Sequence, residues 1–429
     1  MAKSYKDIAI EYARGADGAI VGKEIKLACE RFLSDLERED LELHSKEPDF
    51  VIGIIEKIMV HKQGEDIKGQ SLANTSLTLE PWQIFIVYNL VGFYFKGTSE
   101  RRYKEAFIFI PRKNGKTLFV ASLAFGLALL ERRSGSKIYV TSASLKQAYQ
   151  SFEDILYTLK YRKLDKSFKI RDNYSQHSIQ KEFLDAEGRP DGSIYIEALA
   201  ANPDAQDSFN CNIAIADEIH AFKKAAQYNR FKEAMKAYTN KLMIGITTAG
   251  DNMISFCYRR LEYAVKVVNG TVKDDTLFAF VSRADQDENG EVDYTNPIQH
   301  QKANPNYGVT IRPEEIMNDA LQAQNDPQQR KDFLSRSLNI YTTAMKAYFN
   351  IEEFRASDKK YDWNLKELSK LPIEWYGGAD LSKLHDLTAA ALFGHHKESN
   401  TDIVITHAFF PVVNAAKKAD EDGIPLFGW

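Results

Sequence analysis

The chain has 429 residues, of which 44% are hydrophobic and 27% charged, and its formal net charge at pH 7 is −4. This composition is typical of a soluble globular protein of roughly two to three domains. The net charge excludes a bulk polycation, so any contact with nucleic acid must come from local basic patches. Three widely separated cysteines argue against a disulfide framework or a zinc ribbon: Cys29, Cys211 and Cys257. No apolar run reaches membrane-spanning length and no signal-peptide core is present, which predicts a cytoplasmic protein.

Residues 1–75 have a mainly helical pattern, with apolar stripes at helical spacing over residues 4–39 and a further helix expected over residues 50–60. The segment LTLEPWQ then leads into a strongly apolar helix over residues 84–95, with a proline near its start. The last residue of that segment, Gln83, is either an exposed first-turn residue or an amide that matches the edge of adenine.

Residues 107–131 hold the segment on which the functional interpretation depends. The apolar run FIFI predicts a buried strand of a parallel sheet, and a short polar loop separates it from an apolar helix that opens with GKT. This order is typical of a P-loop, in which backbone N–H groups hold phosphates, Lys116 neutralises their charge and Thr117 ligates Mg²⁺. Ile110 stands where the usual motif has its first glycine. The alternative is therefore a turn that happens to contain Gly-Lys-Thr.

Two later apolar runs also end in polar residues. The first ends in Asp217 and Glu218, which can hold Mg²⁺ through water and polarise an attacking water, although a solvated acidic turn is common in isolation. The second ends in Thr247 and Thr248, at the crevice where doubly wound sheets bind ligands. There the two threonines can sense a γ-phosphate, or they can simply form a helix cap or turn.

Strands and helices alternate through this part of the chain, which predicts an α/β domain with a mainly parallel sheet over residues 76–345. The Lys- and Arg-rich residues 160–171 are most simply a solvated face, and residues 274–306 are polar and in places acidic. A linker is expected over residues 346–372. From residue 373 onwards, three apolar runs with short spacers predict an antiparallel meander, and Asp380 follows the first of them.

Together these segments resemble the large subunit of tailed-phage terminases, the motor that packages DNA. The segments that carry the resemblance, in chain order, are LTLEPWQ (77–83), PRKNGKT (111–117), SASLKQA (142–148), NIAIADEIHAF (212–222), ITTAG (246–250) and GGADLSKLHDLTAA (377–390). Each is weak alone, but their order and spacing are specific. The resemblance implies a P-loop ATPase domain with an N-terminal helical lid (1–75), followed by an RNase H-like α/β nuclease domain (373–429).

The resemblance also implies roles for particular residues. Those implied to contact ATP are Gln83, Arg112, Lys113, Asn114, Gly115, Lys116, Thr117, Thr247 and Thr248. Mg²⁺ is implied to lie at Thr117 and Asp217, with Lys116, Arg112 and Glu218 catalysing hydrolysis. Asp380 is implied to be the first nuclease carboxylate, binding Mg²⁺ or Mn²⁺. An RNase H-like site needs two or three further carboxylates, and nearby the chain offers only Asp386 and Asp402. The nuclease is therefore expected to be incomplete in this chain.

By resemblance, the protein translocates double-stranded DNA into a procapsid and its family cuts concatemeric DNA. The implied partners are DNA, the capsid portal, a small terminase subunit and further copies of this chain in a ring of about five, in the host cytoplasm and transiently on the portal, with no membrane. Two other functions stay open: a helicase-like ATPase that remodels nucleic acid, and a nucleotide-binding regulatory switch without a DNA partner. A fused nuclease fold is expected only for the packaging enzyme.

Overall fold

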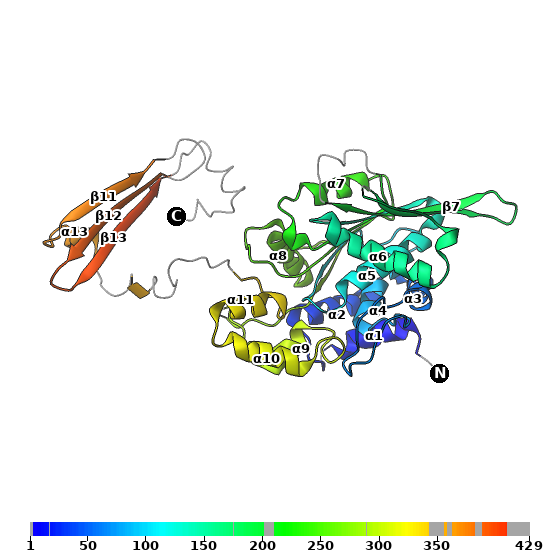
Figure 1. The fold of residues 1–429 in the computed structure, drawn as a ribbon, viewed down its shortest axis with the longest axis horizontal. Helices are drawn as coiled ribbons and strands as arrows, with labels where there is room; N and C mark the ends of the chain where they lie inside the picture. The colour runs from blue at the N-terminus through cyan, green and yellow to red at the C-terminus, as the bar shows by residue number, and fades with distance from the viewer. Residues whose placement is uncertain are drawn as a thin grey trace. The chain divides into compact units, whose positions relative to one another are not determined.

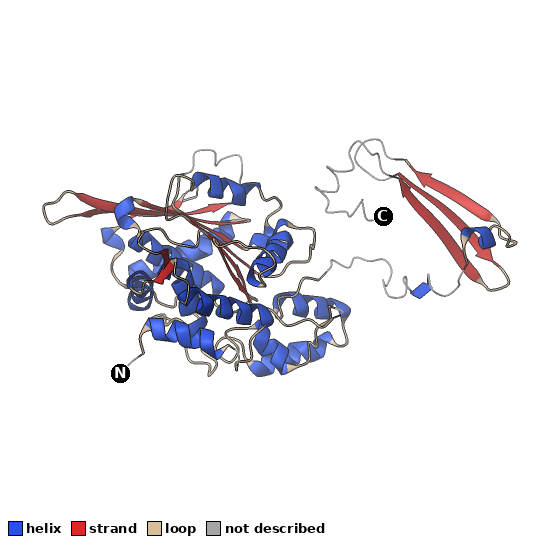
Figure 2. Ribbon diagram, turned by 180° about the vertical axis from the view of Figure 1, so that it is seen from behind, coloured by secondary structure: helices blue, strands red, loops and turns tan. Residues whose placement is uncertain are grey.

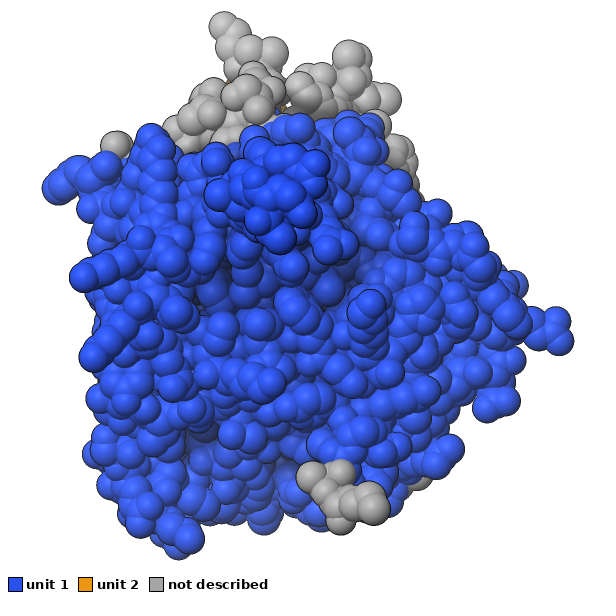
Figure 3. Space-filling model, turned by 90° about the vertical axis from the view of Figure 1, so that its right-hand side faces the viewer, with its two compact units in different colours: residues 1–343 blue, residues 344–429 orange. Residues whose placement is uncertain are grey.

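The computed structural model describes residues 3–16, 18–174, 176–200, 210–288, 290–342, 356–357, 363–381 and 388–409. The chain forms two compact units, residues 1–343 and 344–429, and Figure 3 shows unit 1 as a space-filling surface in blue. Most of the linker expected over residues 346–372 lies outside the described residues. Within the described part of the chain, no helix has the length and apolar character needed to cross a membrane.

An eight-stranded sheet forms the centre of unit 1, in the order β10-β3-β9-β8-β4-β7-β6-β5 (Figure 1). Its strands are β3 (Glu105–Phe109), β4 (Ser136–Ser142), β5 (Lys169–Asp172), β6 (His177–Leu184), β7 (Pro190–Ala200), β8 (Ile213–Asp217), β9 (Leu242–Thr247) and β10 (Leu277–Val281). All pairings from β10 to β7 are parallel, whereas β6 and β5 add antiparallel strands at one edge. The expected α/β fold with a mainly parallel sheet is therefore confirmed.

Helices cover both faces of this sheet. The helices that pack with the sheet are α1 (Tyr5–Gly15), α2 (Lys23–Leu36), α3 (Lys46–Ile58), α4 (Pro81–Gly92), α5 (Lys116–Leu130), α6 (Leu145–Tyr161), α7 (Ala226–Ala234) and α8 (Phe256–Val268). Three further helices, α9 (Pro297–Ala303), α10 (Pro313–Ala323) and α11 (Pro327–Arg336), pack together in a separate cluster. Successive residues of β3 face opposite ways, so that Ile108 packs in the core with α1–α6, and Phe107 and Phe109 pack in the core with α7 and α8. This two-sided burial explains why β3 is apolar at every position.

The N-terminal helices α1, α2 and α3 have no separate core. Their buried residues belong to the same cluster as α4, α5 and one face of the sheet. A short antiparallel pair, β1 (Leu41–Leu43) with β2 (Phe93–Phe95), further ties this region to the end of α4. A boundary at residue 75 and a lid function for these helices remain predictions.

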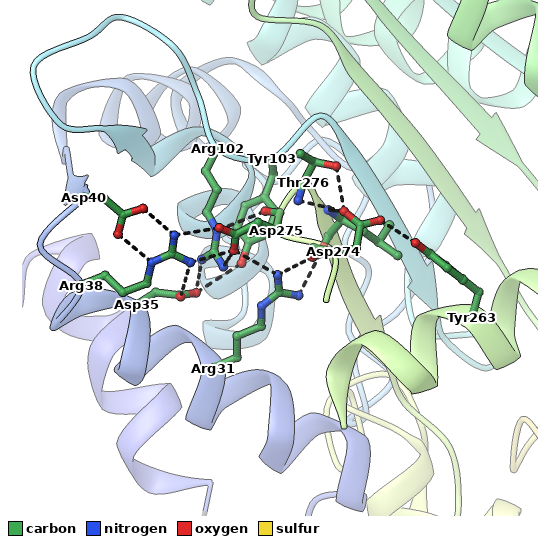
Figure 4. A network of polar contacts seen from close by, with 11 residues as sticks. Arg31, Asp35, Arg38, Asp40, Arg102, Tyr103, Tyr263, Asp274, Asp275 and Thr276 are labelled. Atoms are coloured by element: carbon green, nitrogen blue, oxygen red, sulfur yellow. Dashed lines mark hydrogen bonds and ion pairs between the residues drawn. The ribbon is translucent and has the colours of Figure 1, made fainter. Parts of the chain in front are cut away.

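A buried ionic network fixes α2 to the sheet (Figure 4). The guanidinium of Arg102 is only 1% exposed; it contacts the carboxylate of Asp35 on α2 and lies 2.6 Å from that of Asp275. Arg38 also pairs with Asp275, at 2.7 Å. Arg31 donates to the carbonyl oxygens of Asp274 and Leu277, at 2.8 and 2.9 Å. The network therefore joins α2 to the segment that enters β10.

Two parts of unit 1 contain strands that the sequence pattern did not predict. Residues 274–306 are not polar throughout, because residues 277–281 form β10, which is buried along its whole length beside β3. The basic segment 160–171 ends in strand β5, whose side chains remain largely exposed. Both strands lie at edges of the sheet. Each of these strands forms because it pairs with one neighbouring strand. Such pairing depends on tertiary context, which a short stretch of sequence does not reveal.

Unit 2 contains a three-stranded antiparallel sheet in the order β11-β12-β13. Its strands are β11 (Trp375–Asp380), β12 (Thr388–His396) and β13 (Thr401–Phe409), preceded by the short helix α13 (Leu365–Leu368). The register pairs each strand with the next along the chain, so the expected meander is confirmed. Several large apolar side chains of this sheet are exposed, among them Val404 at 62% and Leu392 at 44%.

Candidate functional site

The loop between β3 and α5 has the backbone geometry of a phosphate-binding loop. Gly115 takes a left-handed conformation at φ 74° and immediately precedes the first residue of α5. Lys113 is also left-handed, at φ 68°, which is uncommon for a residue with a side chain. The loop therefore turns sharply into the N-terminus of a buried helix, where unpaired N–H groups and the helix dipole favour an anion.

Asn114 holds this loop from within. Its side chain is fully buried; it donates to the Oδ1 atom of Asn304 at 2.8 Å and accepts from the N–H of Asn306 at 3.0 Å. Asn306 in turn accepts a hydrogen bond from the indole of Trp82 at 2.7 Å, and Thr310 donates to the carbonyl of Lys113 at 2.7 Å. The Asn114 side chain is thus committed to the segment after α9. Because these bonds occupy the side chain, a contact of Asn114 with a nucleotide would have to come from its backbone, and that contact stays a prediction.

Lys116 and Glu218 meet across the end of the sheet. The Nζ atom of Lys116 lies 2.9 Å from the Oε1 atom of Glu218, and their side chains are only 7% and 21% exposed. This contact is possible because β3 and β8 both flank β9 and run parallel, which brings their carboxyl ends to one edge. Two residues 102 positions apart in the chain, each selected from sequence as catalytic, therefore form one ion pair.

Glu218 has an unusual backbone. Its φ of 54° is left-handed, and its N–H is bonded to the carbonyl of Ile246 on β9 at 2.9 Å and to the Asp217 carboxylate at 2.9 Å. A left-handed conformation costs a residue with a side chain roughly 1 kcal/mol or more. The two hydrogen bonds compensate for this cost and aim the Glu218 side chain at Lys116.

His220 is a site residue that the sequence pattern did not single out. Its Nδ1 atom lies 3.1 Å from the Oε2 atom of Glu218 and 3.1 Å from the hydroxyl of Thr247. Its backbone N–H donates to the same hydroxyl at 3.0 Å. His220 therefore links the acidic end of β8 to the threonine at the end of β9. The only signal in the sequence was its place two residues after the acidic pair.

The two carboxylates have opposite electrostatic surroundings. Burial raises the pKa of Asp217 to about 6, with Lys116 opposing and the Glu218 charge adding to the rise. Burial also raises the pKa of Glu218, but its contacts with His220 and Lys116 outweigh burial and bring that pKa down to about 2. Glu218 therefore holds its charge, and Asp217 is a buried carboxylate that a cation would stabilise.

Thr247 and Thr248 are both fully buried at the end of β9. The hydroxyl of Thr247 receives the contacts from His220, whereas that of Thr248 has no hydrogen-bond partner among the described residues. The following N–H, of Ala249, donates at 2.7 Å to the side chain of Asn339, just before the end of unit 1. The end of β9 thus contacts both the acidic pair and the segment that leaves the unit.

Four other candidate residues take different positions. Gln83 is buried, and its Oε1 atom accepts from the N–H of Glu80 at 2.9 Å as part of a capping box at the start of α4. A contact with adenine, which stays a prediction, would have to use the Nε2 atom of Gln83 or open this cap. Arg112 and Lys113 have exposed side chains on the loop. Thr117, the second residue of α5, is half-buried.

Asp380 is the last residue of β11 and is exposed, opposite Ala389 in the register. Asp386 lies outside the described residues, and the Oδ1 atom of Asp402 lies 2.8 Å from the Nδ1 atom of His395. Within the described part of the chain, no group of three or more His, Cys, Asp or Glu side chains is arranged to hold a metal ion. The nuclease role of Asp380 stays a prediction.

Two family models match the chain in succession. The model described as "Terminase large subunit, ATPase domain" matches residues 81–266, and the one described as "Terminase large subunit, endonuclease domain" matches residues 271–424. The first match contains the P-loop, the acidic pair and both threonines. The second begins shortly before β10 and includes the meander of unit 2.

Individual relatives agree with these matches. Protein YmfN of Escherichia coli (strain K12) is 32% identical over 154 residues, which are 36% of this chain and 33% of that protein. The terminase large subunit of Enterobacteria phage HK97 is 24% identical over 389 residues, which are 88% of this chain and 68% of that protein. The chain thus spans a third of the length of one curated relative and about two thirds of the other.

The fold agrees as well. The crystal structure of the HK97 bacteriophage large terminase superimposes with a TM-score of 0.53 at 21% sequence identity, over 89% of this chain and 72% of that one. An ATPase-domain match that holds the P-loop and an endonuclease-domain match that holds the meander follow each other within one chain. This chain therefore belongs to the terminase large subunit family.

Proposed function

We propose that this protein hydrolyses ATP at the loop between β3 and α5 and uses the energy to move double-stranded DNA into a procapsid. The observation that carries the proposal is the ion pair between Lys116 and Glu218, at 2.9 Å, at the edge where the ends of β3, β8 and β9 meet. Ligands of open α/β sheets bind at the carboxyl ends of the strands. The succession of ATPase and endonuclease domain matches favours packaging over a helicase-like ATPase or a regulatory switch.

The residues of the site have the chemistry that phosphoryl transfer needs. Lys116 supplies a nearly buried cation for the transferred phosphoryl group, and Glu218, charged and aimed by its own backbone bonds, orients the attacking water. Arg112, Lys113 and Gly115 lie on the loop that would enclose the phosphates. The exposed guanidinium of Arg112 is free to move toward the developing charge. Thr248, whose hydroxyl has no partner among the described residues, is placed to bind a phosphate oxygen.

The residues present also fit a divalent cation. Asp217 is a buried carboxylate whose pKa is raised by burial, and Thr117 offers a hydroxyl at the start of α5. Oxygen ligands of this kind are those that Mg²⁺ takes beside nucleotide phosphates. Bound there, Mg²⁺ supplies charge neutralisation and orients the phosphates. In unit 2, Asp380 would contribute one carboxylate to Mg²⁺ or Mn²⁺ for cutting concatemeric DNA.

The remaining partners follow from the same proposal. The protein assembles as a ring of copies, five by family resemblance, around double-stranded DNA. It receives that DNA from a small terminase subunit and docks on the capsid portal in the host cytoplasm. The experiment that tests the core of the proposal is a steady-state ATPase assay with and without double-stranded DNA.

We expect DNA to raise turnover of the wild-type chain, Lys116→Ala to abolish hydrolysis, and Glu218→Gln to bind ATP without turning it over. Asp154→Asn is the matched control, because Asp154 is a half-buried carboxylate on α6 whose pKa burial raises to about 6. Its rate should equal that of the wild type. Near wild-type turnover by Glu218→Gln would show that the acidic pair was assigned wrongly. A rate that DNA does not change would favour the regulatory switch.

A further inference from the structure

The outer edge of the eight-stranded sheet is strongly basic. Residues 160–171, which run from the end of α6 into β5, contain six Lys and Arg residues and a single Asp, in a chain whose net charge is −4. One of the six, Arg162, is used internally, because it donates to the carbonyl of Ile58 and the hydroxyl of Ser76. The other five, all exposed, are called the basic edge: Lys160, Lys163, Lys166, Lys169 and Arg171.

The charges of the basic edge are only partly compensated from within, where Arg171 donates to the Oε1 atom of Gln176 at 3.0 Å and its charge acts on the carboxylate of Glu197. None of the five side chains forms an ion pair with a carboxylate of the described residues, whereas most other basic side chains of the neighbouring hairpin are engaged. Arg189 pairs with Asp185 and Glu187, and Lys181 lies over the ring of Phe168, 4.9 Å from its centroid. Like charges without full compensation repel one another, so the edge is disposed to bind an anion that spans several side chains.

The geometry of β5 fixes the positions of two of the five basic side chains. Lys169 and Arg171 occupy alternate positions of β5 and project from one face of the sheet, while Ile170 packs against the core on the other face. One row of paired residues crosses four neighbouring strands: Lys169 on β5, Gln180 on β6, Tyr195 on β7 and Lys137 on β4. A transverse row therefore has an exposed lysine at each end, roughly 14 Å apart at the usual strand spacing.

The position of the edge leaves it accessible. In Figures 1 and 2, the hairpin of β6 and β7 extends beyond the helices that cover the rest of the sheet, and Figure 3 views unit 1 from that side. The edge strand β5 pairs with the base of the hairpin, at residues 177–180. The tip of the hairpin, residues 185–191, has three acidic residues and one Arg. The surface suited to a polyanion is therefore the base of the hairpin and not its tip.

We propose that the basic edge contacts the phosphate backbone of double-stranded DNA during translocation, an inference that rests on the proposed function. Flexible lysines bind phosphates as point charges without reading bases, which suits a motor that must move along any sequence. An acidic protein partner is the less favoured occupant, because protein interfaces are depleted in lysine and enriched in aromatic residues and arginine, and four of the five residues here are lysines.

A second account of the lysines is that they keep β5 from pairing with the edge strand of another molecule. The two accounts predict different results when the charges are removed. Loss of DNA contacts lowers affinity for DNA, whereas loss of edge protection produces self-association without a change in DNA affinity.

The test is binding of the full chain to a fluorescent mixed-sequence duplex, measured by anisotropy between 50 and 200 mM salt. The variant is Lys160→Gln, Lys166→Gln and Lys169→Gln together, which leaves out Lys163 because its left-handed backbone, at φ 57°, complicates substitution. The matched control replaces three exposed loop lysines elsewhere on unit 1 with Gln: Lys68, Lys96 and Lys273. A Lys→Arg triple at the basic edge keeps the charge and tests whether charge alone matters.

If each lysine neutralises one phosphate, the variant should lower the slope of log affinity against log salt by about 2.7 and weaken binding on the order of 100-fold at 0.15 M salt. The control and the Lys→Arg triple should bind like the wild type, and ATP hydrolysis without DNA should not change. Equal affinity of the Gln triple and the wild type, with or without self-association, would overturn the assignment and leave the packaging function standing. A wild-type chain that neither binds DNA nor is stimulated by it would overturn both.

Discussion

Replacing Asp35 with Asn should destabilise unit 1 by breaking the buried ion pair of the network in Figure 4. The Asp35 carboxylate is 4% exposed and its partner, the Arg102 guanidinium, is 1% exposed. An amide keeps the shape of the side chain but removes its charge. The buried cation then retains only Asp275, which is 43% exposed and lies 2.6 Å from it.

The expected cost follows from this geometry. Removing one partner of a buried ion pair costs about 3–5 kcal/mol, because the other charge is left without compensation in a medium of low polarity. Asp275 compensates in part, so we expect the lower end of this range, about 3 kcal/mol in the free energy of unfolding. The double variant Asp35→Leu with Arg102→Met removes both charges and should recover most of the loss, since apolar replacements of buried pairs are often close to neutral.

The assay is urea unfolding of the full chain monitored by helical circular dichroism. This signal reports unit 1, because α1 to α11 lie there, whereas the only helix that the structure defines over several residues in unit 2 is the short α13. Asp40→Asn is the control, since Asp40 pairs with Arg38 at the surface, and it should leave the midpoint unchanged. An Asp35→Asn chain as stable as this control, or a double variant less stable than Asp35→Asn, would refute the electrostatic account of the network.

Further predictions concern the residues of the proposed sites. Arg112→Lys should lower kcat for ATP more than it weakens ATP binding, because lysine lacks the planar fork of the guanidinium; an unchanged kcat would contradict this. Asn114→Ala should leave the buried amide partners of Asn114 unpaired and cost about 1–3 kcal/mol, shared between unfolding and ATP affinity, both measurable by titration. His220→Ala should raise the pKa of Glu218, since burial raises that pKa and the His220 contact opposes it; loss of activity on acidification should then begin at a higher pH, and an unmoved pH profile would rule out the coupling. In plasmid digestion with Mg²⁺ or Mn²⁺, this chain should cut poorly, and robust cutting that disappears in Asp380→Ala would show a complete nuclease site.

Three of the strands predicted from sequence, β3, β8 and β9, are buried on both faces. These three strands are apolar at almost every position because helices cover both faces of the sheet. The missed strand β5 has alternating charged residues and is stabilised by pairing with β6 alone. The missed strand β10 is apolar but stands in a polar stretch of the chain. It forms a strand by pairing with β3, which is remote in sequence.

The site shows the same limit. Lys116 and Glu218 were recognised because each lies in a local motif, and the parallel sheet then brings them together. The amide cluster of Asn304 and Asn306 around the loop has no such motif, since its hydrogen bonds join residues about 190 positions apart. His220 stood beside a recognised pair, but its contact with Thr247 becomes evident only when β8 and β9 are adjacent.

The position of β10 decides where the chain can be divided. The two family matches meet between residues 266 and 271, yet β10, at residues 277–281, lies beyond that point and pairs along its full length with the strand that leads into the P-loop. A fragment ended at the junction of the matches would lose this strand and expose the backbone edge of β3. Such a fragment should aggregate through that edge, whereas one extended to residue 343 keeps every strand of the ATPase sheet. The loop between β3 and α5 is therefore supported by a strand that lies outside the segment matched by the ATPase-domain model.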